Sequence, residues 1–220
     1  MSVMRSVKPR RAAVLSVHTS PLEQLGAGIR VLELDVTGDV SALQDLGCDL
    51  LVANAGGAFD LDPLAVADVE TWARMYDVNV LGVVRTVQAL LPALRRARGH
   101  VVMTGSTAGR WVYEGGGGYV AAKHALAALR DTLRLEEVAH GLRVSEVAPG
   151  MVHTEEFSLQ RFGGDQERAD EVYAGVEPLT AEDVAEAIVW VASRPAHVNI
   201  DLVQLTPQQQ AGVGKVVRHP

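Results

Sequence analysis

Tyr119 and Lys123, in the segment "YVAAK" (119–123), are the residues whose types and spacing most directly suggest chemistry. Residues four apart lie on one face of a helix, so the lysine ammonium would sit one turn from the phenol. A tyrosine with an ordinary pKa, near ~10, is a poor proton-transfer partner at neutral pH, and a nearby positive charge lowers the cost of its phenolate. The pair therefore predicts an acid/base centre.

The elements that would position this pair follow from the hydrophobic pattern. Strand-like apolar runs alternate with helical patterns, which indicates an α/β fold: a Rossmann-like, doubly wound parallel sheet in three layers. The predicted strands are 12–17, 30–36, 49–55, 100–106, 142–150 and 199–205, and the predicted helices are 68–95, 118–139 and 180–193. Thr180 and Asp183 have the spacing of a helix cap at the start of the last helix.

Polar or glycine-bearing turns follow four of these strands. They are Asp35, "NAGG" (54–57), "TGSTAG" (104–109) and "PGMVHT" (149–154). In an open parallel sheet, ligands bind beyond the carboxyl ends of the strands, so these turns are expected to meet at one crevice.

Six short segments, in this order, resemble the short-chain dehydrogenase/reductase family. They are "LDVT" (34–37), "NAG" (54–56), "NVLG" (79–82), "VVMTGSTAG" (101–109), "YVAAK" (119–123) and "PGMVHT" (149–154). Ser106 precedes Tyr119 by 13 residues, which agrees with the family's usual spacing. The segments 161–175 and 194–210 also resemble the subgroup of NADP-dependent 3-hydroxy acid and serine dehydrogenases, so the resemblance extends from about 12 to about 210.

The resemblance implies a catalytic tetrad of Asn79, Ser106, Tyr119 and Lys123. Lys123 would lower the pKa of Tyr119, and Ser106 would donate a hydrogen bond to the substrate oxygen. By the same resemblance, Asn79 would hold a water that links Lys123 to solvent.

The implied cofactor is NADP, bound by residues at the strand ends. These are Asp35, Val36, Asn54, Ala55, Gly56, Tyr119, Lys123, Pro149, Gly150, Val152 and Thr154. We expect weak or altered binding, because the glycine-rich turn that normally receives the diphosphate is missing: residues 1–25 contain no glycine.

Because this glycine-rich turn is missing, the N-terminal segment can be aligned with the family in two ways. Residues 12–17 are either the family's second strand, with the first strand and helix absent, or its central first strand, followed by a shortened crossover. A βαβ unit usually takes ~30 residues or more, and residues 12–36 are fewer. We favour the central position, because an empty central slot would leave backbone groups unpaired. A deletion or a late reading-frame start is a further explanation.

Three other features bear on the site. The run "GGGG" (115–118) is expected to be a flexible substrate loop, since it lacks the context of a phosphate cradle. Arg110 and Arg161 are candidates to bind a substrate carboxylate, although surface or ion-paired roles are commoner for such side chains. The histidines show no metal-ligand spacing, so no metal is expected.

Composition limits the class of protein. The chain has 220 residues with 48% apolar residues, which predicts a single domain over 1–220, with 1–11 disordered and 211–220 as a tail. A formal charge of -7 argues against a nucleic-acid partner, and no apolar run predicts a membrane span. Cys48 is the single cysteine, so a reducing cytoplasm is the expected location.

The predicted function is an oxidoreductase that interconverts a small hydroxy compound and its carbonyl with NADP(H). The resemblance also implies a homo-oligomer, a dimer or a tetramer, paired through helices 68–95 and 118–139. The alternatives are a cofactor-independent acid/base enzyme, such as a dehydratase, isomerase or cyclase, and a catalytically silent subunit.

Overall fold

The computed structural model describes residues 12–16, 29–154, 157–212 and 214–219. Residues 1–11, for which disorder is predicted, lie outside the described residues.

A four-stranded parallel sheet forms the centre of the molecule, in the order β3-β4-β5-β6. Its strands are β3 (Leu50–Ala53), β4 (His100–Thr104), β5 (Arg143–Pro149) and β6 (Leu202–Leu205). Side chains alternate across it: Val101, Met103 and Val144 face one hydrophobic core, while Val102 and Val147 face another. The predicted α/β fold with a parallel sheet is therefore confirmed.

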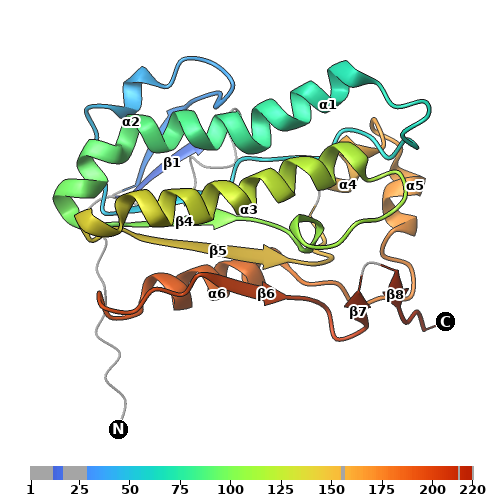
Figure 1. The fold of residues 1–220 in the computed structure, drawn as a ribbon. Helices are drawn as coiled ribbons and strands as arrows, with labels where there is room; N and C mark the ends of the chain where they lie inside the picture. The colour runs from blue at the N-terminus through green and yellow to red at the C-terminus, as the bar shows by residue number, and fades with distance from the viewer. Residues whose placement is uncertain (1–11, 17–28, 155–156, 213, 220) are drawn as a thin grey trace, which may run out of the picture.

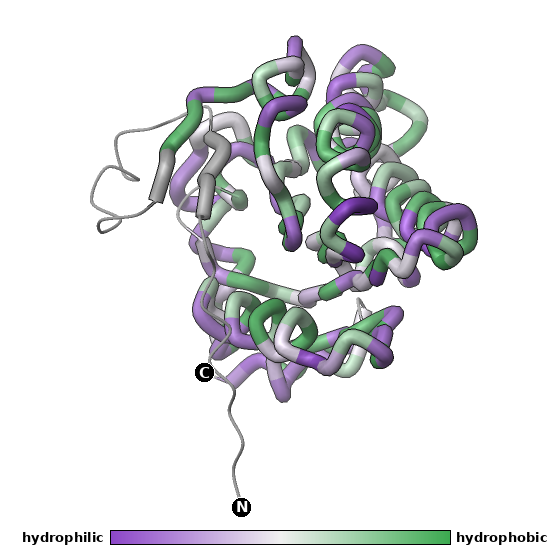
Figure 2. The backbone as a smooth tube through the Cα atoms, turned by 90° about the vertical axis from the view of Figure 1, so that its left-hand side faces the viewer, coloured by the Kyte–Doolittle hydropathy of each residue, from purple (hydrophilic) through white to green (hydrophobic). Residues whose placement is uncertain are grey.

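Helices cover both faces of this sheet (Figure 1). On one face lie α1 (Val69–Tyr76), η2 (Asp77–Leu81), α2 (Gly82–Ala97) and α3 (Gly117–Glu137). On the other lies α6 (Ala181–Ala192), which packs on β4 and β5. Figure 2 shows α6 separated from α1–α3 by the sheet. Thr180 and Asp183 form the capping box that the sequence predicts for α6.

The predicted helix 68–95 is one long rod interrupted by a π-type turn, η2. Asp68 caps its start by accepting bonds from the backbone N–H groups of Glu70 and Thr71. By length and composition, Val69–Ala97 would be apolar enough to cross a membrane, but half of its most apolar 18-residue window is buried within the molecule. The apolar face is thus accounted for by core packing.

The N-terminal strands form a separate pair. β1 (Ala12–Ser16) pairs in parallel with β2 (Ile29–Glu33), and in the described part of the chain neither strand is bonded to β3. In the alignment that we favoured, residues 12–17 are the central strand and would pair with β3. They do not, so that alignment is wrong about the pairing of this strand. The pairing that is seen, with β2 alone, agrees with the alternative alignment.

Because β1 and β2 are separate from the main sheet, one face of β3 is partly exposed. Leu51 and Ala53 are buried in the core below α2, but Leu50 and Val52, which point the other way, are 42% and 38% exposed. A strand inside a doubly wound sheet is normally covered on both faces. Among the described residues, β3 pairs only with β4, and the face that carries Leu50 and Val52 is only partly covered.

The C-terminal part adds short elements around the site. These are α4 (Phe157–Arg161), α5 (Gln166–Glu171), β7 (Gln210–Gly212) and β8 (Lys215–Val216). The predicted tail 211–220 is ordered in part, since β7 and β8 pair antiparallel. The backbone of His219 also bonds to Gly175. Three further 3-10 turns complete the described elements: η1 (Ser41–Leu43), η3 (Thr107–Gly109) and η4 (Val138–His140).

Candidate active site

Ser106 lies immediately beyond the carboxyl end of β4. The strand ends at Thr104, and Ser106 caps the short turn η3 by accepting a bond from the Ala108 N–H at 3.1 Å. The side chain is buried. A serine at a strand end, held in a capped turn, is fixed in position before any substrate arrives.

Tyr119 and Lys123 lie in the first two turns of α3, and both are buried. The Lys123 ammonium is 5.6 Å from the centre of the Tyr119 ring and donates a hydrogen bond to the Thr104 carbonyl at 3.1 Å. The helical spacing predicted from the sequence is therefore present, and it aims both side chains at the end of β4.

The pKa values of this pair differ from the sequence-based expectation. Burial raises the pKa of Tyr119 above its usual value, while the neighbouring Ser106 hydroxyl and Arg161 oppose that shift. Burial also lowers the pKa of Lys123 to about 8, against the attraction of Glu146. The expected lowering of the Tyr119 pKa is thus wrong for the protein alone, because desolvation outweighs nearby charge. Tyr119 is a neutral phenol at neutral pH.

Asn79 is placed by the π-type turn η2, which the sequence pattern does not reveal. The side chain is fully buried, and its amide donates to the Gly57 and Met75 carbonyls, each at 2.8 Å. Its Oδ1 atom is buried and has no hydrogen-bond partner among the described residues. Such an oxygen is suited to accept a hydrogen bond from a water or a ligand.

The loop after β3 closes on these residues. A side chain at Gly56 would meet the Asn79 Oδ1 atom at 2.6 Å and the Lys123 ammonium at 3.5 Å. Only glycine lets the backbone pass this close. Asn54 and Ala55, in the same loop, are exposed. The structure therefore brings Gly56 beside Asn79 and Lys123.

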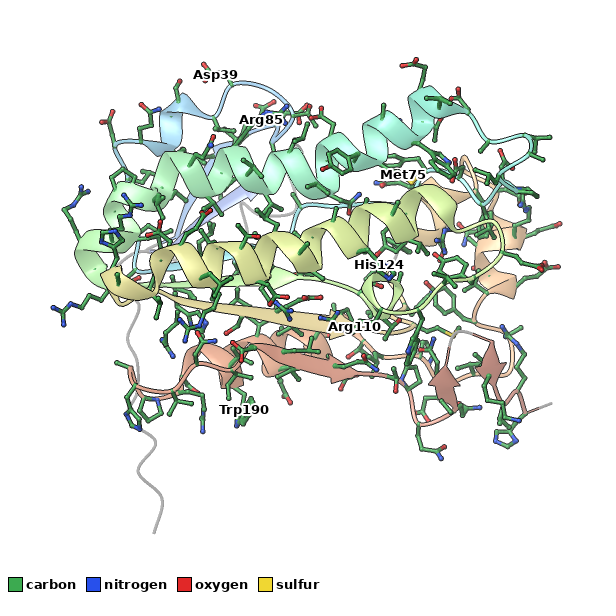
Figure 3. All side chains as sticks on the ribbon, viewed as in Figure 1. Asp39, Met75, Arg85, Arg110, His124 and Trp190 are labelled. Carbon is green, nitrogen blue, oxygen red and sulfur yellow. The ribbon has the colours of Figure 1, made fainter. Side chains whose placement is uncertain are left out.

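Asp35 and Val36 follow β2, apart from the other residues. Asp35 is exposed, and its carboxylate accepts bonds from the N–H and hydroxyl of Thr37, which lower its pKa. Val36 packs against Gly82, and its carbonyl accepts a bond from Arg85 at 3.2 Å. This turn is thus anchored to α2 (Figure 3, where Arg85 is labelled).

The turn after β5 is held from several sides. Pro149 ends β5, and the Gly150 N–H bonds to Leu205 in β6 at 2.8 Å. The Val152 carbonyl accepts a bond from the Tyr173 hydroxyl, and the Thr154 hydroxyl accepts one from the Phe157 N–H. These four predicted residues, Pro149, Gly150, Val152 and Thr154, lie along the turn that leads from β5 into α4.

The glycine run 115–118 is a packing device, and its expected role as a flexible loop is not what the structure shows. Gly117 and Gly118 belong to α3. Side chains at these positions would meet Trp72 of α1 at 2.6 and 2.8 Å. Glycine here allows α1 and α3 to approach closely, and the approach sets where Tyr119 enters the site.

Arg110 is engaged in an internal ion pair. It donates two hydrogen bonds to the Glu146 carboxylate, at 2.8 and 3.0 Å, and Arg130 lies 3.3 Å from the same carboxylate. Figure 3 shows Arg110 beside the end of β5. Glu146 is fully buried and was missed in the sequence reading; its signal is a charged residue within the apolar strand run "VSEVA".

Arg161, at the end of α4, lies against the aromatic side of the site. Its guanidinium is 5.5 Å from the centre of the Tyr119 ring, and it donates a hydrogen bond to the Tyr113 hydroxyl at 2.5 Å. The two candidate arginines therefore differ: Arg110 is bound to Glu146, and Arg161 faces Tyr119.

A cavity of about 440 Å³ lies elsewhere and contains none of the predicted site residues. It is lined by residues 177–179 and 206–209 together with Asp183 and His219.

Comparison with known proteins gives consistent matches. The model of the family described as "short chain dehydrogenase" matches residues 17–161. An uncharacterized oxidoreductase of Mycobacterium tuberculosis (strain H37Rv) is 52% identical over 158 residues, which are 71% of this chain and 62% of that relative. The match thus spans less than two thirds of that relative's length.

More of the chain is covered by other relatives. The NADP-dependent 3-hydroxy acid dehydrogenase YdfG of Escherichia coli (strain K12) is 37% identical over 201 residues, which cover 87% of this chain and 81% of that protein. Among solved structures, a closed form of serine dehydrogenase complexed with NADP+ superposes with a TM-score of 0.88 at 34% identity, covering 96% of this chain and 90% of that one.

Proposed function

Because the chain belongs to the short-chain dehydrogenase family, we propose that it interconverts a small hydroxy compound and its carbonyl with NADP(H), through Asn79, Ser106, Tyr119 and Lys123. The family membership confirms the resemblance inferred from the motifs. One observation carries the proposal: buried Tyr119 and Lys123 lie together at the end of β4, beside Ser106. Such pairs of perturbed titratable groups mark acid/base sites.

Each residue of this tetrad has a separate task in the reduction direction. Tyr119, neutral because burial raises its pKa, donates its proton to the substrate oxygen as that oxygen gains charge. Ser106 orients the oxygen by a hydrogen bond, and the Lys123 ammonium stabilises the phenolate that remains. The unpaired Asn79 Oδ1 accepts from a water through which Tyr119 and Lys123 regain a proton. NADPH supplies the hydride when it is bound.

The described residues fit one end of this cofactor. The Gly56 backbone lies beside the unpaired Asn79 oxygen and Lys123, and these groups could bind the hydroxyls of a nicotinamide ribose. By the family resemblance, residues 149–154 would complete this end of the cofactor site. Asp35, with Asn54 and Ala55, would meet the adenosine. The diphosphate lacks the glycine-rich turn that normally receives it, because residues 1–25 contain no glycine. We therefore propose weakened NADP(H) binding.

A calorimetric titration with NADPH and NADH, paired with turnover assays, tests the function. Wild-type protein and Tyr119→Phe should both bind NADPH, while the variant loses about 10²- to 10⁴-fold in turnover. Tyr76→Phe is the matched control, since Tyr76 is exposed and should leave turnover unchanged. Absence of NADPH and NADH binding at saturating concentration would overturn the proposal.

The split sheet favours one alternative. If the diphosphate seat is lost, Tyr119 and Lys123 remain a complete acid/base pair, suited to a dehydration, isomerisation or cyclisation without nicotinamide. Substrate-dependent hydride transfer rules this out. A catalytically silent subunit is excluded if the isolated homo-oligomer turns over substrate and Tyr119→Phe abolishes that turnover.

We also propose that the protein forms a homo-oligomer in the cytoplasm. Exposed apolar residues on α1 and α3, including Val69 and Leu135, support the assembly. Size-exclusion chromatography with light scattering tests this assembly. The double variant Val69→Asp/Leu135→Asp should have a smaller molar mass than the wild type.

A further inference from the structure

Glu146 places a charge inside the molecule, on the face of the sheet that also receives Lys123. It lies on β5, two residues after Val144, and side chains two apart on a strand point to the same face. Val144 packs in the core with Leu126 of α3, the helix that carries Lys123. The Glu146 side chain is fully buried on this face. A buried carboxylate is costly unless it is paired and hydrogen-bonded.

Two arginines bind this carboxylate and fix its place. Arg110, directly after η3, donates two hydrogen bonds to it at 2.8 and 3.0 Å, and Arg130 of α3 lies 3.3 Å away. Gly105 leaves room for the group, because a side chain at that position would lie 2.6 Å from the Glu146 Cδ atom. The carboxylate is therefore held against the backbone that directly follows β4.

The same stretch of backbone holds Lys123. The Lys123 ammonium donates a hydrogen bond at 3.1 Å to the carbonyl of Thr104, the residue before Gly105. Gly109, in η3, passes so close to α3 that a side chain there would meet the Lys123 carbonyl at 2.8 Å. The Glu146 carboxylate and the Lys123 ammonium thus lie against neighbouring residues of one segment.

The charge of Glu146 acts on Lys123 with a definite sign. Burial lowers the pKa of Lys123 to about 8, and the negative charge of Glu146 opposes that shift. Burial and the carboxylate therefore act against each other, and their balance decides at which pH the ammonium loses its charge.

Other groups on the elements around Lys123 are neutral or have partners elsewhere. Tyr119, one turn away on α3, stays neutral because burial raises its pKa, and Arg161 of α4 contacts the Tyr119 ring. The remaining groups are Gly56 after β3, Asn79 on η2, Asp77, which pairs with Arg85, and His100 at the far end of β4, which bonds to Ser145.

We propose that Glu146 is a positioning residue for the reaction: held by its two arginines, the carboxylate keeps the Lys123 ammonium charged at neutral pH. This inference rests on the proposed function, because it assigns a supporting residue to the same site. A charged Lys123 stabilises the phenolate that Tyr119 becomes, so loss of the Glu146 charge confines carbonyl reduction to lower pH. Glu146 acts through Lys123 and transfers no proton itself.

NMR of the lysine side chains measures this coupling without turnover. The chain contains three lysines, Lys8, Lys123 and Lys215, so a ¹³C-lysine spectrum is simple, and Lys123→Met assigns the signal of Lys123. In Glu146→Gln the midpoint of the Lys123 titration should fall by about one pH unit. The decline of kcat/KM for reduction should move by the same amount. Glu146→Asp, which keeps the charge, should restore both values toward those of the wild type.

A purely structural role for Glu146 predicts the opposite sign. If Glu146 only held the fold together, its loss would admit water and raise the Lys123 midpoint toward the usual lysine value of ~10.4. An unchanged or raised midpoint in Glu146→Gln therefore overturns the proposal.

Glu137→Gln is the matched control. Glu137 is also buried and also bound at two points by an arginine, Arg95, but it lies about 20 Å further along α3. Its loss should leave the Lys123 midpoint unchanged, and equal shifts in Glu137→Gln and Glu146→Gln would overturn the proposal.

Two further measurements keep the test decisive. If Glu146→Gln does not fold, Arg110→Gln replaces it: this variant removes a positive charge that offsets the carboxylate, so the Lys123 midpoint should rise. An unchanged or lowered midpoint there overturns the proposal. A midpoint that shifts as expected supports the coupling of Glu146 to Lys123 even if the wild type gives no hydride transfer, a result that would overturn the proposed function alone.

Discussion

Arg110 and Glu146 form a two-point ion pair that ties the turn after Ser106 to the middle of the sheet. The guanidinium belongs to the residue directly after η3, and the carboxylate is fully buried on β5. The pair fixes the turn that carries Ser106. The negative charge of Glu146 also acts on Lys123, because it opposes the lowering of the Lys123 pKa. One carboxylate thus supports two residues of the proposed tetrad.

Removing Arg110 should therefore destabilise the protein more than removing an exposed arginine. Arg110→Gln leaves the buried Glu146 with Arg130 alone and should cost about 3 kcal/mol in the free energy of unfolding. Arg85→Gln, which breaks the half-exposed pair with Asp77, should cost less than about 1 kcal/mol. Urea unfolding of both variants checks this. Equal costs would show that the buried pair adds nothing.

Gly105→Ala should disturb the same pair from the backbone side. A side chain at Gly105 would lie 2.6 Å from Cδ and 2.7 Å from Cγ of Glu146, which Arg110 and Arg130 hold in place. We expect a loss of about 2 kcal/mol by overpacking. Gly47→Ala is the control, since nothing lies within 4 Å, and should shift stability by less than about 0.5 kcal/mol. Thermal or urea unfolding distinguishes them, and a neutral Gly105→Ala would contradict the packing.

His100 should make the fold sensitive to acid. Burial, with a contribution from Arg143, lowers its pKa from 6.5 to about 3, and the ring bonds to Ser145 at 2.7 Å. Between pH 6.5 and about 3 the unfolded chain binds a proton that folded His100 does not, so stability falls as pH falls, by up to about 1.4 kcal/mol per pH unit. Above pH 6.5 this contribution is constant.

His100→Gln isolates that effect. The variant keeps a polar partner for Ser145 but cannot titrate, so its urea-unfolding free energy should fall less steeply between pH 6.5 and 4. Parallel slopes for wild type and variant would disprove the assignment.

Carbonyl reduction should slow above about pH 8. Lys123, whose pKa is lowered to about 8, is charged below that pH and loses its charge above it, while Tyr119 stays protonated. If the ammonium stabilises the phenolate, kcat/KM falls by up to about tenfold per pH unit. Lys123→Arg, which stays charged, should move the decline to higher pH. A profile that is level to pH 10 in wild type would remove Lys123 from this role.

Because one face of β3 is partly exposed, we expect that face to tolerate polar substitutions, which is unusual for a strand of an α/β sheet. Leu50→Thr should change the free energy of unfolding by less than about 1 kcal/mol, because Leu50 is 42% exposed. Leu51→Thr, one residue along and buried below α2, should cost about 3 kcal/mol. Similar costs at both positions would show that the second face of β3 is covered in solution.

Most elements of this fold are readable from the sequence because local pattern determines them. Runs of apolar residues predicted β3, β4, β5 and β6 within a few residues, and Thr180 with Asp183 predicted the start of α6. The spacing of four residues between Tyr119 and Lys123 is also a local feature of the sequence. The favoured alignment gave β1 the wrong neighbour, because the strand it joins depends on which backbone groups remain free elsewhere in the sheet.

Some features of the candidate site were likewise predictable from the sequence, and others were not. By itself the sequence determined the residue types, their order and the helical spacing of Tyr119 and Lys123, since these depend only on position along the chain. Tertiary structure alone decided that Arg110 is bound to a buried Glu146 while Arg161 faces Tyr119, that the glycines at 117 and 118 admit Trp72, and that the Tyr119 pKa is raised. Desolvation and side-chain pairing depend on which distant segments are packed together, and no local pattern records that.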